Sequence, residues 1–251
     1  MQPFFAAISF LTIVRIPPAW CGDEQALGRS LSWFPVVGLL IGCVAAVFDG
    51  LLRTLFPGLL VPSALTIILL LSISGGFHLD GLADSADAFM SSRSKERMLE
   101  IMKDSRCGPM GVLVIVALLL LKFAALASLS GDWRTPTIVL MPLAGRSALV
   151  LKTVSLDYVR GSGLVSLFQH GNRERHCGIT LLLLGGGSFL AFGLKGFWVL
   201  FACLLVVWLF ARYCRAKIGG LTGDTLGAAC ELLEVVPPLV VLMLMGTGGE
   251  I

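Results

Sequence analysis

The sequence has few charged residues for its length, and they form no extended tract of one sign. Only 14% of the 251 residues are Asp, Glu, Lys or Arg, whereas 56% are hydrophobic, and the formal net charge is +3. A net charge this small, with the basic residues scattered, gives no reason to expect a nucleic-acid partner. The composition also argues against a soluble domain, in which about a quarter of the residues are charged.

Cysteine pairs with metal-ligand spacing are also missing. The seven cysteines include no Cys-x-x-Cys pair, so neither a zinc site nor an iron–sulfur site is expected. Their odd number and the lack of a secreted-domain framework favour free thiols next to a reducing compartment. They are Cys21, Cys43, Cys107, Cys177, Cys203, Cys214 and Cys230.

A secretory signal is lacking at the start of the chain. Residues 2–16 are largely apolar, but no basic residue precedes them and no small-residue cleavage site comes before Pro17 and Pro18. We expect this segment to be retained and to lie at the membrane interface or to be re-entrant.

Long apolar runs, in contrast, are abundant. Runs of about 20 residues recur with polar breaks between them, which predicts an all-α, polytopic membrane bundle of about six to seven transmembrane helices. Pro237 and Pro238 break the last run, so the sequence leaves open whether it crosses fully. The runs are 34–52, 59–74, 110–129, 137–153, 177–194, 197–213 and 232–245.

Three polar loops are expected between these spans, at residues 76–108, 154–176 and 214–231. Alternating spans put all three loops and the N-terminal segment on one side, together with 14 of the 19 Lys and Arg residues. The positive-inside rule predicts that this side faces the cytoplasm.

The first of these loops, with the two glycines before it, reads GGFHLDGLADSADAFMSSRSKERMLEIMKDSRCG over residues 75–108. Asp80, Asp84 and Asp87 follow the spacing i, i+4, i+7, so on a helix they share one face within about 60°. Such close carboxylates repel one another by roughly 1 to 4 kcal/mol per pair. The pattern predicts a bound divalent cation, because three aligned carboxylates make a poor solvated helix end.

Asp104 and five basic residues complete the same loop. Carboxylates beside basic groups suggest a metal ion together with a phosphate, since Mg²⁺ is held by a few carboxylates and substrate phosphates, and guanidinium groups bind phosphoryl oxygens. This composition fits phosphoryl transfer, in which a carboxylate near the nucleophile can also accept its proton. The basic residues are Arg93, Lys95, Arg97, Lys103 and Arg106, and we expect Arg97, Lys103 and Arg106 to hold the phosphates.

Weaker candidates lie elsewhere in the chain. Asp224 and Glu231 are seven residues apart and could share a helix face that binds substrate, or simply solvate a helix end. Lys122 and Arg146 fall within spans, where an ionisable group is a candidate functional residue, although Lys122 could instead snorkel. His78 could contact substrate or form only a local hydrogen bond.

Three other readings compete with an enzyme: an ion-coupled transporter, a membrane scaffold and an intramembrane aspartyl protease. The first two are disfavoured because the acids cluster at a span boundary beside basic residues, and no internal repeat is found. The protease is disfavoured because it needs two acids within spans, whereas every Asp considered lies in an expected loop. The residues alone predict a metal-dependent membrane enzyme that acts on a phosphate.

The run GGFHLDGLADSADAF followed by RSKERMLEIMKDSRCGPMG closely resembles the signature of the cobalamin synthase family, the adenosylcobinamide-GDP ribazoletransferases. The segments FLTIVRIPP, RSLSWFPVVGLLIG and GGLTGDTLGAACELLE are also similar to that family, in the expected order. The resemblance implies one catalytic domain over residues 1–251, in the inner membrane, with its active site towards the cytoplasm.

The implied reaction joins α-ribazole or its 5'-phosphate to adenosylcobinamide-GDP and releases GMP, with Mg²⁺ as cofactor. By this resemblance Asp80, Asp84, Asp87 and Asp104 lie at the metal and the diphosphate, and Asp224 matches the TGDT block. The chemistry parallels that of CDP-alcohol phosphotransferases, but their D-x₂-D-G-x₂-A-R run is absent. A second copy of this chain and other enzymes of the cobalamin pathway are both left open as partners.

Overall fold

The protein is all-helical, as the sequence predicts. The computed structural model describes residues 1–104, 106–160, 163–169 and 172–246. Within these ranges the secondary structure is helical except for one isolated parallel β-bridge between Tyr158 and Leu221.

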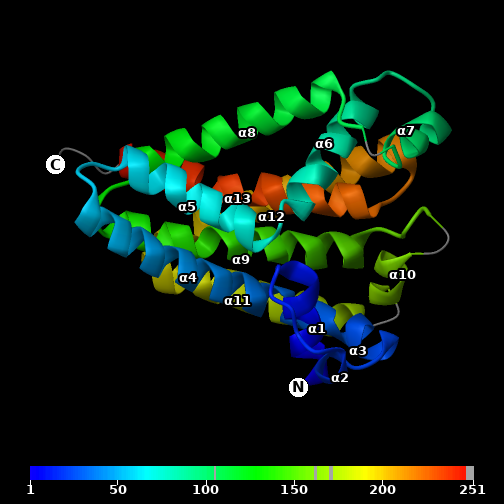
Figure 1. Ribbon diagram of the computed structural model, residues 1–251, viewed down its shortest axis with the longest axis horizontal. Helices are drawn as coiled ribbons and strands as arrows, with labels where there is room; N and C mark the ends of the chain where they lie inside the picture. The colour runs from blue at the N-terminus through cyan, green and yellow to red at the C-terminus, as the bar shows by residue number, and fades with distance from the viewer. Residues whose placement is uncertain (105, 161–162, 170–171, 247–251) are drawn as a thin grey trace.

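Seven apolar helices run roughly side by side along the longest axis of the molecule (Figure 1). Six of them have 20 to 24 residues, which is about 30 Å of helix and matches the hydrocarbon thickness of a bilayer. The seventh, α5, has only 14 residues. The helices are α4 (Phe34–Leu55), α5 (Leu60–Ile73), α8 (Pro109–Ser128), α9 (Arg134–Ser155), α11 (Arg173–Phe192), α12 (Gly196–Ile218) and α13 (Gly223–Gly246).

By length and composition, five helical stretches can cross a membrane, or six if α5 and the helix after it form one bent span. One of the five, Arg173–Ile218, contains both α11 and α12. These helices separate at Gly193, whose φ of 58° favours glycine, and they pack antiparallel, because Gly185 contacts Leu200 and Gly196 meets the backbone of Ser188. The prediction of a polytopic bundle with six to seven spans is thus confirmed.

The shorter helices gather mainly towards one end of the bundle, the right-hand side of Figure 1, whereas the end of α13 lies at the other end. α1 has only 10 residues, about 15 Å, so it is too short to cross. The shorter elements at this end are α1 (Gln2–Leu11), α2 (Pro18–Cys21), α3 (Glu24–Arg29), η1 (Ser30–Trp33), α6 (Phe77–Phe89), α7 (Lys95–Ile101) and α10 (Leu164–Phe168), and two 3₁₀ turns, η2 (Gly131–Trp133) and η3 (Gly193–Lys195), link long helices.

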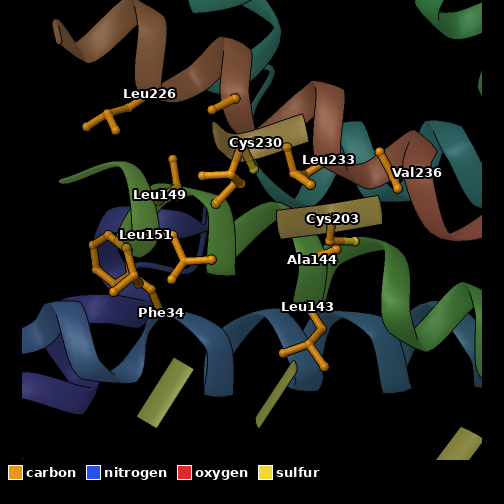
Figure 2. Close-up of a cluster of buried hydrophobic side chains, with 14 of the residues drawn as sticks. Phe34, Leu143, Ala144, Leu149, Leu151, Cys203, Leu226, Cys230, Leu233 and Val236 are labelled. Carbon is orange, nitrogen blue, oxygen red and sulfur yellow. The ribbon is translucent and has the colours of Figure 1, made fainter. Parts of the chain in front are cut away.

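Helix α9 is the centre of the bundle, because it packs against α4, α11, α12 and α13. Of its apolar stretch 89% is buried, against 28% for that of α8, which lies at the periphery. On α4, Gly38 and Gly42 let the backbones approach, since a Cβ at either would collide with the α9 backbone at Pro142 or Val139. Figure 2 shows side chains of α9, such as Leu143, between those of α4 and α13.

A buried ion pair fixes the end of the bundle away from the short helices. The Arg134 guanidinium on α9 donates to both carboxylate oxygens of Asp49 on α4, at 3.0 and 2.5 Å, and both side chains are fully buried. The same guanidinium donates to the carbonyl of Leu126 and to the hydroxyl of Ser63, so one cation connects α4, α5, α8 and α9. Arg53 adds a second contact to Asp49 at 3.1 Å.

The structure corrects several expected boundaries. The segment 214–231 is not a loop, because α12 continues to Ile218 and α13 begins at Gly223. Helices α6 and α7 occupy much of 76–108, and α10 lies within 154–176. The expectation of loops was wrong for the aspartates on α6 and for Asp224 on α13, whereas Asp104 does lie between helices. Pro237 and Pro238 lie inside a continuous α13, since neighbouring helices can satisfy the backbone groups that a proline frees.

The prediction of free cysteines is confirmed, because all seven cysteines are unpaired.

Candidate functional site

Helix α6 carries the predicted acidic motif across the end of the bundle. The chain turns by 89° between α5 and α6 at Gly75 and Gly76, whose φ values of 62° and 73° are readily adopted only by glycine. After this turn α6 runs steeply across the direction of α5 and packs against α8 and α13 (Figure 1). The acidic face of α6 therefore lies beside the first turns of α8 and α13, at the end of the bundle.

Asp87 fastens α6 to the first turn of α8. Its carboxylate accepts hydrogen bonds from the backbone N–H groups of Gly108 at 2.7 Å and Gly111 at 2.9 Å. A carboxylate at this position satisfies free N–H groups and interacts favourably with the positive end of the helix dipole. A Cβ at either glycine would collide with the Asp87 carboxylate, so glycine is required for this approach. Both oxygens of this predicted metal ligand thus already accept hydrogen bonds.

Asp80 and Asp84 lie on α6 beside the start of α13, which carries Asp224. Gly81 brings the two helices together, because a Cβ there would lie 2.7 Å from the carbonyl oxygen of Asp224. Partial burial, with the charges of Asp80, Asp224 and Asp87, raises the pKa of Asp84 to about 7. We call Asp80, Asp84 and Asp224 the acidic site.

Arg160 is the basic residue of the acidic site, and the sequence did not reveal it. Its guanidinium donates to Asp224 at 2.7 Å, and the side chains of both residues are 20% exposed. The β-bridge positions it, because Val159 donates to the carbonyl of Leu221 and the N–H of Leu221 donates to Asp157. Arg160 is 64 residues from Asp224 in a segment without a motif, so only the tertiary structure joins them.

Of the three predicted phosphate-binding residues, the two arginines are paired locally on the surface. Arg97 forms an exposed ion pair with Glu100 at 2.6 Å, and Arg106 binds both carboxylate oxygens of Asp104. Hydrogen bonds from Arg106 lower the pKa of Asp104 to about 2. Lys103 is exposed. The structure therefore pairs Asp104 with Arg106 and not with the acidic site.

No preformed metal cage is found in the described ranges, where no group of three or more His, Cys, Asp or Glu side chains is arranged to hold an ion. The acidic site nevertheless suits a hard cation, because it combines three carboxylates with the one guanidinium of Arg160. Mg²⁺ commonly takes one or two carboxylates and completes its shell with water and substrate phosphate. The donors therefore fit a cation that binds together with a phosphorylated substrate.

Arg146 and Glu231, predicted to bind substrate, belong instead to a buried network between α8, α9 and α13. Lys122 donates to Glu231 and to Glu234 at 2.7 Å each, and Arg146 pairs with Glu234. Each of these side chains is at most 4% exposed, so Lys122 does not snorkel. The positive charges of Lys122 and Arg146 balance the negative charges of Glu231 and Glu234. The sequence analysis did not select Glu234 as a candidate.

His78 is 2% exposed, and neither ring nitrogen has a hydrogen-bond partner among the residues that the structure describes. It lines an apolar cavity of about 30 Å³ together with Phe10, Phe34 and Phe77. That volume has room for ordered water. The prediction that His78 contacts substrate therefore stays a prediction.

Comparison with known proteins agrees with the resemblance seen in the sequence. Residues 3–243 match the family described as Cobalamin-5-phosphate synthase, CobS. The chain belongs to the CobS family. It is 37% identical to the adenosylcobinamide-GDP ribazoletransferase of Geotalea daltonii, over 100% of this chain and 99% of that protein. The enzyme of the same name from Pseudomonas fluorescens is 41% identical over 93% of this chain and 96% of that protein. The one from Pseudomonas entomophila is 42% identical over 94% of this chain and 96% of that protein. No solved structure matches the chain significantly.

Proposed function

We propose that this CobS family member is an adenosylcobinamide-GDP ribazoletransferase of the bacterial inner membrane, acting in the last steps of cobalamin biosynthesis. The observation that carries the proposal is the full-length similarity to relatives that bear this name, at 37 to 42% identity. The acidic site supports it, since a carboxylate cluster at the end of a membrane bundle suits a charged substrate that arrives from water.

In the proposed reaction a hydroxyl of α-ribazole, or of its 5'-phosphate, attacks the β-phosphorus of adenosylcobinamide-GDP. A new phosphorus–oxygen bond forms, the bond from the β-phosphorus to the bridging oxygen breaks, and GMP leaves with that oxygen. We assign the hydroxyl proton to a carboxylate oxygen of Asp84, because partial burial and the neighbouring carboxylates of Asp80 and Asp224 favour its protonated form.

Mg²⁺ is the proposed cofactor, with Asp80 and Asp84 as its ligands and Asp224 beside them. When bound, the ion would neutralise negative charge on the diphosphate. Asp87 and Asp104 contribute less in this proposal, because the backbone N–H groups of α8 and the Arg106 guanidinium already bind their oxygens.

The diphosphate itself is bound by basic side chains. We propose Arg97, Lys103 and Arg106, of which the two arginines would exchange their exposed acidic partners for phosphate. Exposed ion pairs contribute little to stability, so little free energy opposes this exchange. Arg160 is a further candidate, because it already lies beside Asp224.

The direct test is an assay with purified protein in detergent. We expect GMP to appear when adenosylcobinamide-GDP, α-ribazole and Mg²⁺ are all present, and not when any one is omitted or EDTA is added. GMP release without α-ribazole would indicate a hydrolase, and release in EDTA would contradict the cation. The alternative, an ion-coupled transporter, predicts no GMP and instead ion-dependent uptake of a corrinoid into proteoliposomes.

The bundle end that carries the acidic site is proposed to face the cytoplasm. Cys107 lies at this end beside the start of α8, and Asp132 lies past the far end of the same helix; both are exposed. An impermeant thiol reagent added to intact cells should therefore leave Cys107 unlabelled. The same reagent should label Asp132→Cys in a Cys107→Ser background. The opposite labelling pattern would reverse the orientation.

A further inference from the structure

A hollow lies between the N-terminal helices and the start of α11, away from the elements that carry the acidic site. Its volume is about 310 Å³. Helix α1 and the short elements α3 and η1 form one side, and the first turn of α11 forms the other. The side chains that line it include Arg29, Ser32, Trp33, Asn172, Arg175 and His176.

The hollow is positively charged, and its two guanidinium groups have no acidic partner in the described part of the chain. The contact of Arg29 is with the neutral amide of Gln25, at 3.2 Å. Arg175 lies in the first turn of α11, a 20-residue helix whose positive dipole end points to the hollow. Two guanidinium groups without an acidic partner beside a helix N-terminus favour an anion, although Glu174 in the same turn adds one negative charge.

His176 supplies an independent indication of a ligand. The residue is 5% exposed, and its Nδ1 lies 2.6 Å from the hydroxyl of Ser32, whereas Nε2 is buried without a partner among the described residues. In the tautomer whose Nδ1 accepts from the Ser32 hydroxyl, the proton lies on Nε2, so this nitrogen is a buried donor. A buried donor without an acceptor is costly, and an anionic oxygen in the hollow would satisfy it.

The side chains around the hollow match those found at a membrane interface. Trp33, on its wall, is 40% exposed, and tryptophan is enriched at membrane interfaces. Leu40 on α4 and Leu181 on α11 are exposed apolar residues, so these helices face lipid beyond the hollow. Six residues separate Arg175 from Leu181, which is about 9 Å along the helix. The guanidinium groups are thus next to the hydrocarbon boundary.

We propose that this hollow binds the phosphate of an anionic phospholipid headgroup. Guanidinium groups bind phosphate oxygens in pairs of hydrogen bonds, and basic pockets between helices at the membrane surface bind anionic headgroups. A bound lipid would connect the N-terminal helices to α11. The site shares no residue with the acidic site, so it does not depend on the proposed reaction.

The test is binding of phosphatidylglycerol to the purified protein in neutral detergent, followed by thermal unfolding. We expect phosphatidylglycerol to raise the melting temperature saturably and phosphatidylcholine to have no such effect. Inorganic phosphate is a separate arm, because it offers the same oxygens without acyl chains. Equal stabilisation by inorganic phosphate, with no preference for phosphatidylglycerol, would overturn the lipid assignment.

Paired variants locate the site. Arg29→Gln with Arg175→Gln should weaken phosphatidylglycerol binding about tenfold or more, because two charge-assisted contacts are lost. The matched control is Arg15→Gln with Arg173→Gln, which removes the same charge from exposed residues outside the hollow and should leave binding unchanged. Equal weakening by both pairs would mean nonspecific attraction and would overturn the proposal.

Variants of His176 provide a second test that leaves both arginines in place. His176→Gln keeps a donor near the Nε2 position, whereas His176→Asn keeps only a group that can contact Ser32. We expect binding to survive in the glutamine variant and to weaken in the asparagine variant. The reverse order would show that His176 acts only through Ser32, contrary to the proposal.

Discussion

Asp80→Asn and Asp84→Asn should each lower kcat for GMP release at least about 100-fold, while the protein remains folded. Asparagine is nearly isosteric with aspartate but has no charge, so the change removes a ligand for the cation or the acceptor for the hydroxyl proton. Loss of one electrostatic group in an active site typically has an effect of this size. The measurement is GMP release at saturating substrates.

Thermal unfolding in detergent separates catalysis from stability in these variants. Removal of one of several repelling carboxylates should leave the melting temperature unchanged or raise it, because burial and neighbouring negative charge already disfavour ionised Asp84. Asp132→Asn, on the exposed turn past the far end of α8, is the matched control and should keep full activity. Wild-type turnover in both acidic-site variants would refute the assignment.

Asp49→Asn should destabilise the fold by about 3 to 5 kcal/mol, the usual cost of leaving one charge of a buried pair without its partner. The buried charge here is Arg134, which would keep Ser63 and the carbonyl of Leu126 but lose both carboxylate contacts. The measurement is unfolding of the purified protein in mixed micelles of mild detergent and sodium dodecyl sulfate.

Two comparisons make this prediction specific. Arg53→Gln removes the partly exposed partner of the same carboxylate and should cost no more than about 1 kcal/mol. Asp49→Asn combined with Arg134→Gln should be less destabilising than the sum of the single changes, because it removes both buried charges. Additive losses, or a single-variant loss as small as that of Arg53→Gln, would contradict the account.

The sequence predicted the parts of the structure that depend on local pattern. Apolar runs gave the number of spans, and the i, i+4, i+7 spacing placed three aspartates on one helix, now seen as α6. The sequence did not show that the chain would turn by 89° before α6 and carry α6 across the end of the bundle. That arrangement depends on the contacts of Gly81 with α13 and of Asp87 with α8, which join distant parts of the chain.

Pairs that are distant in the chain could not be predicted from a single sequence. Arg160 reaches Asp224 across 64 residues, and Arg134 reaches Asp49 across 85. Each residue alone resembles an ordinary charge near the end of a span. Glu234 was missed for a related reason, since it falls within an apolar run and only the fold brings Lys122 and Arg146 to it.

The attachment of α8 has a consequence for how the bilayer acts on this protein. Helix α8 is the least enclosed of the singly crossing helices, yet Asp87 joins its first turn to α6, two turns of helix from Asp80. A helix with so much lipid-facing surface adjusts its tilt to the thickness of the surrounding hydrocarbon. A change in membrane thickness would therefore reach the acidic site through the packing of α8 against α6, where Asp87 holds the first turn of α8.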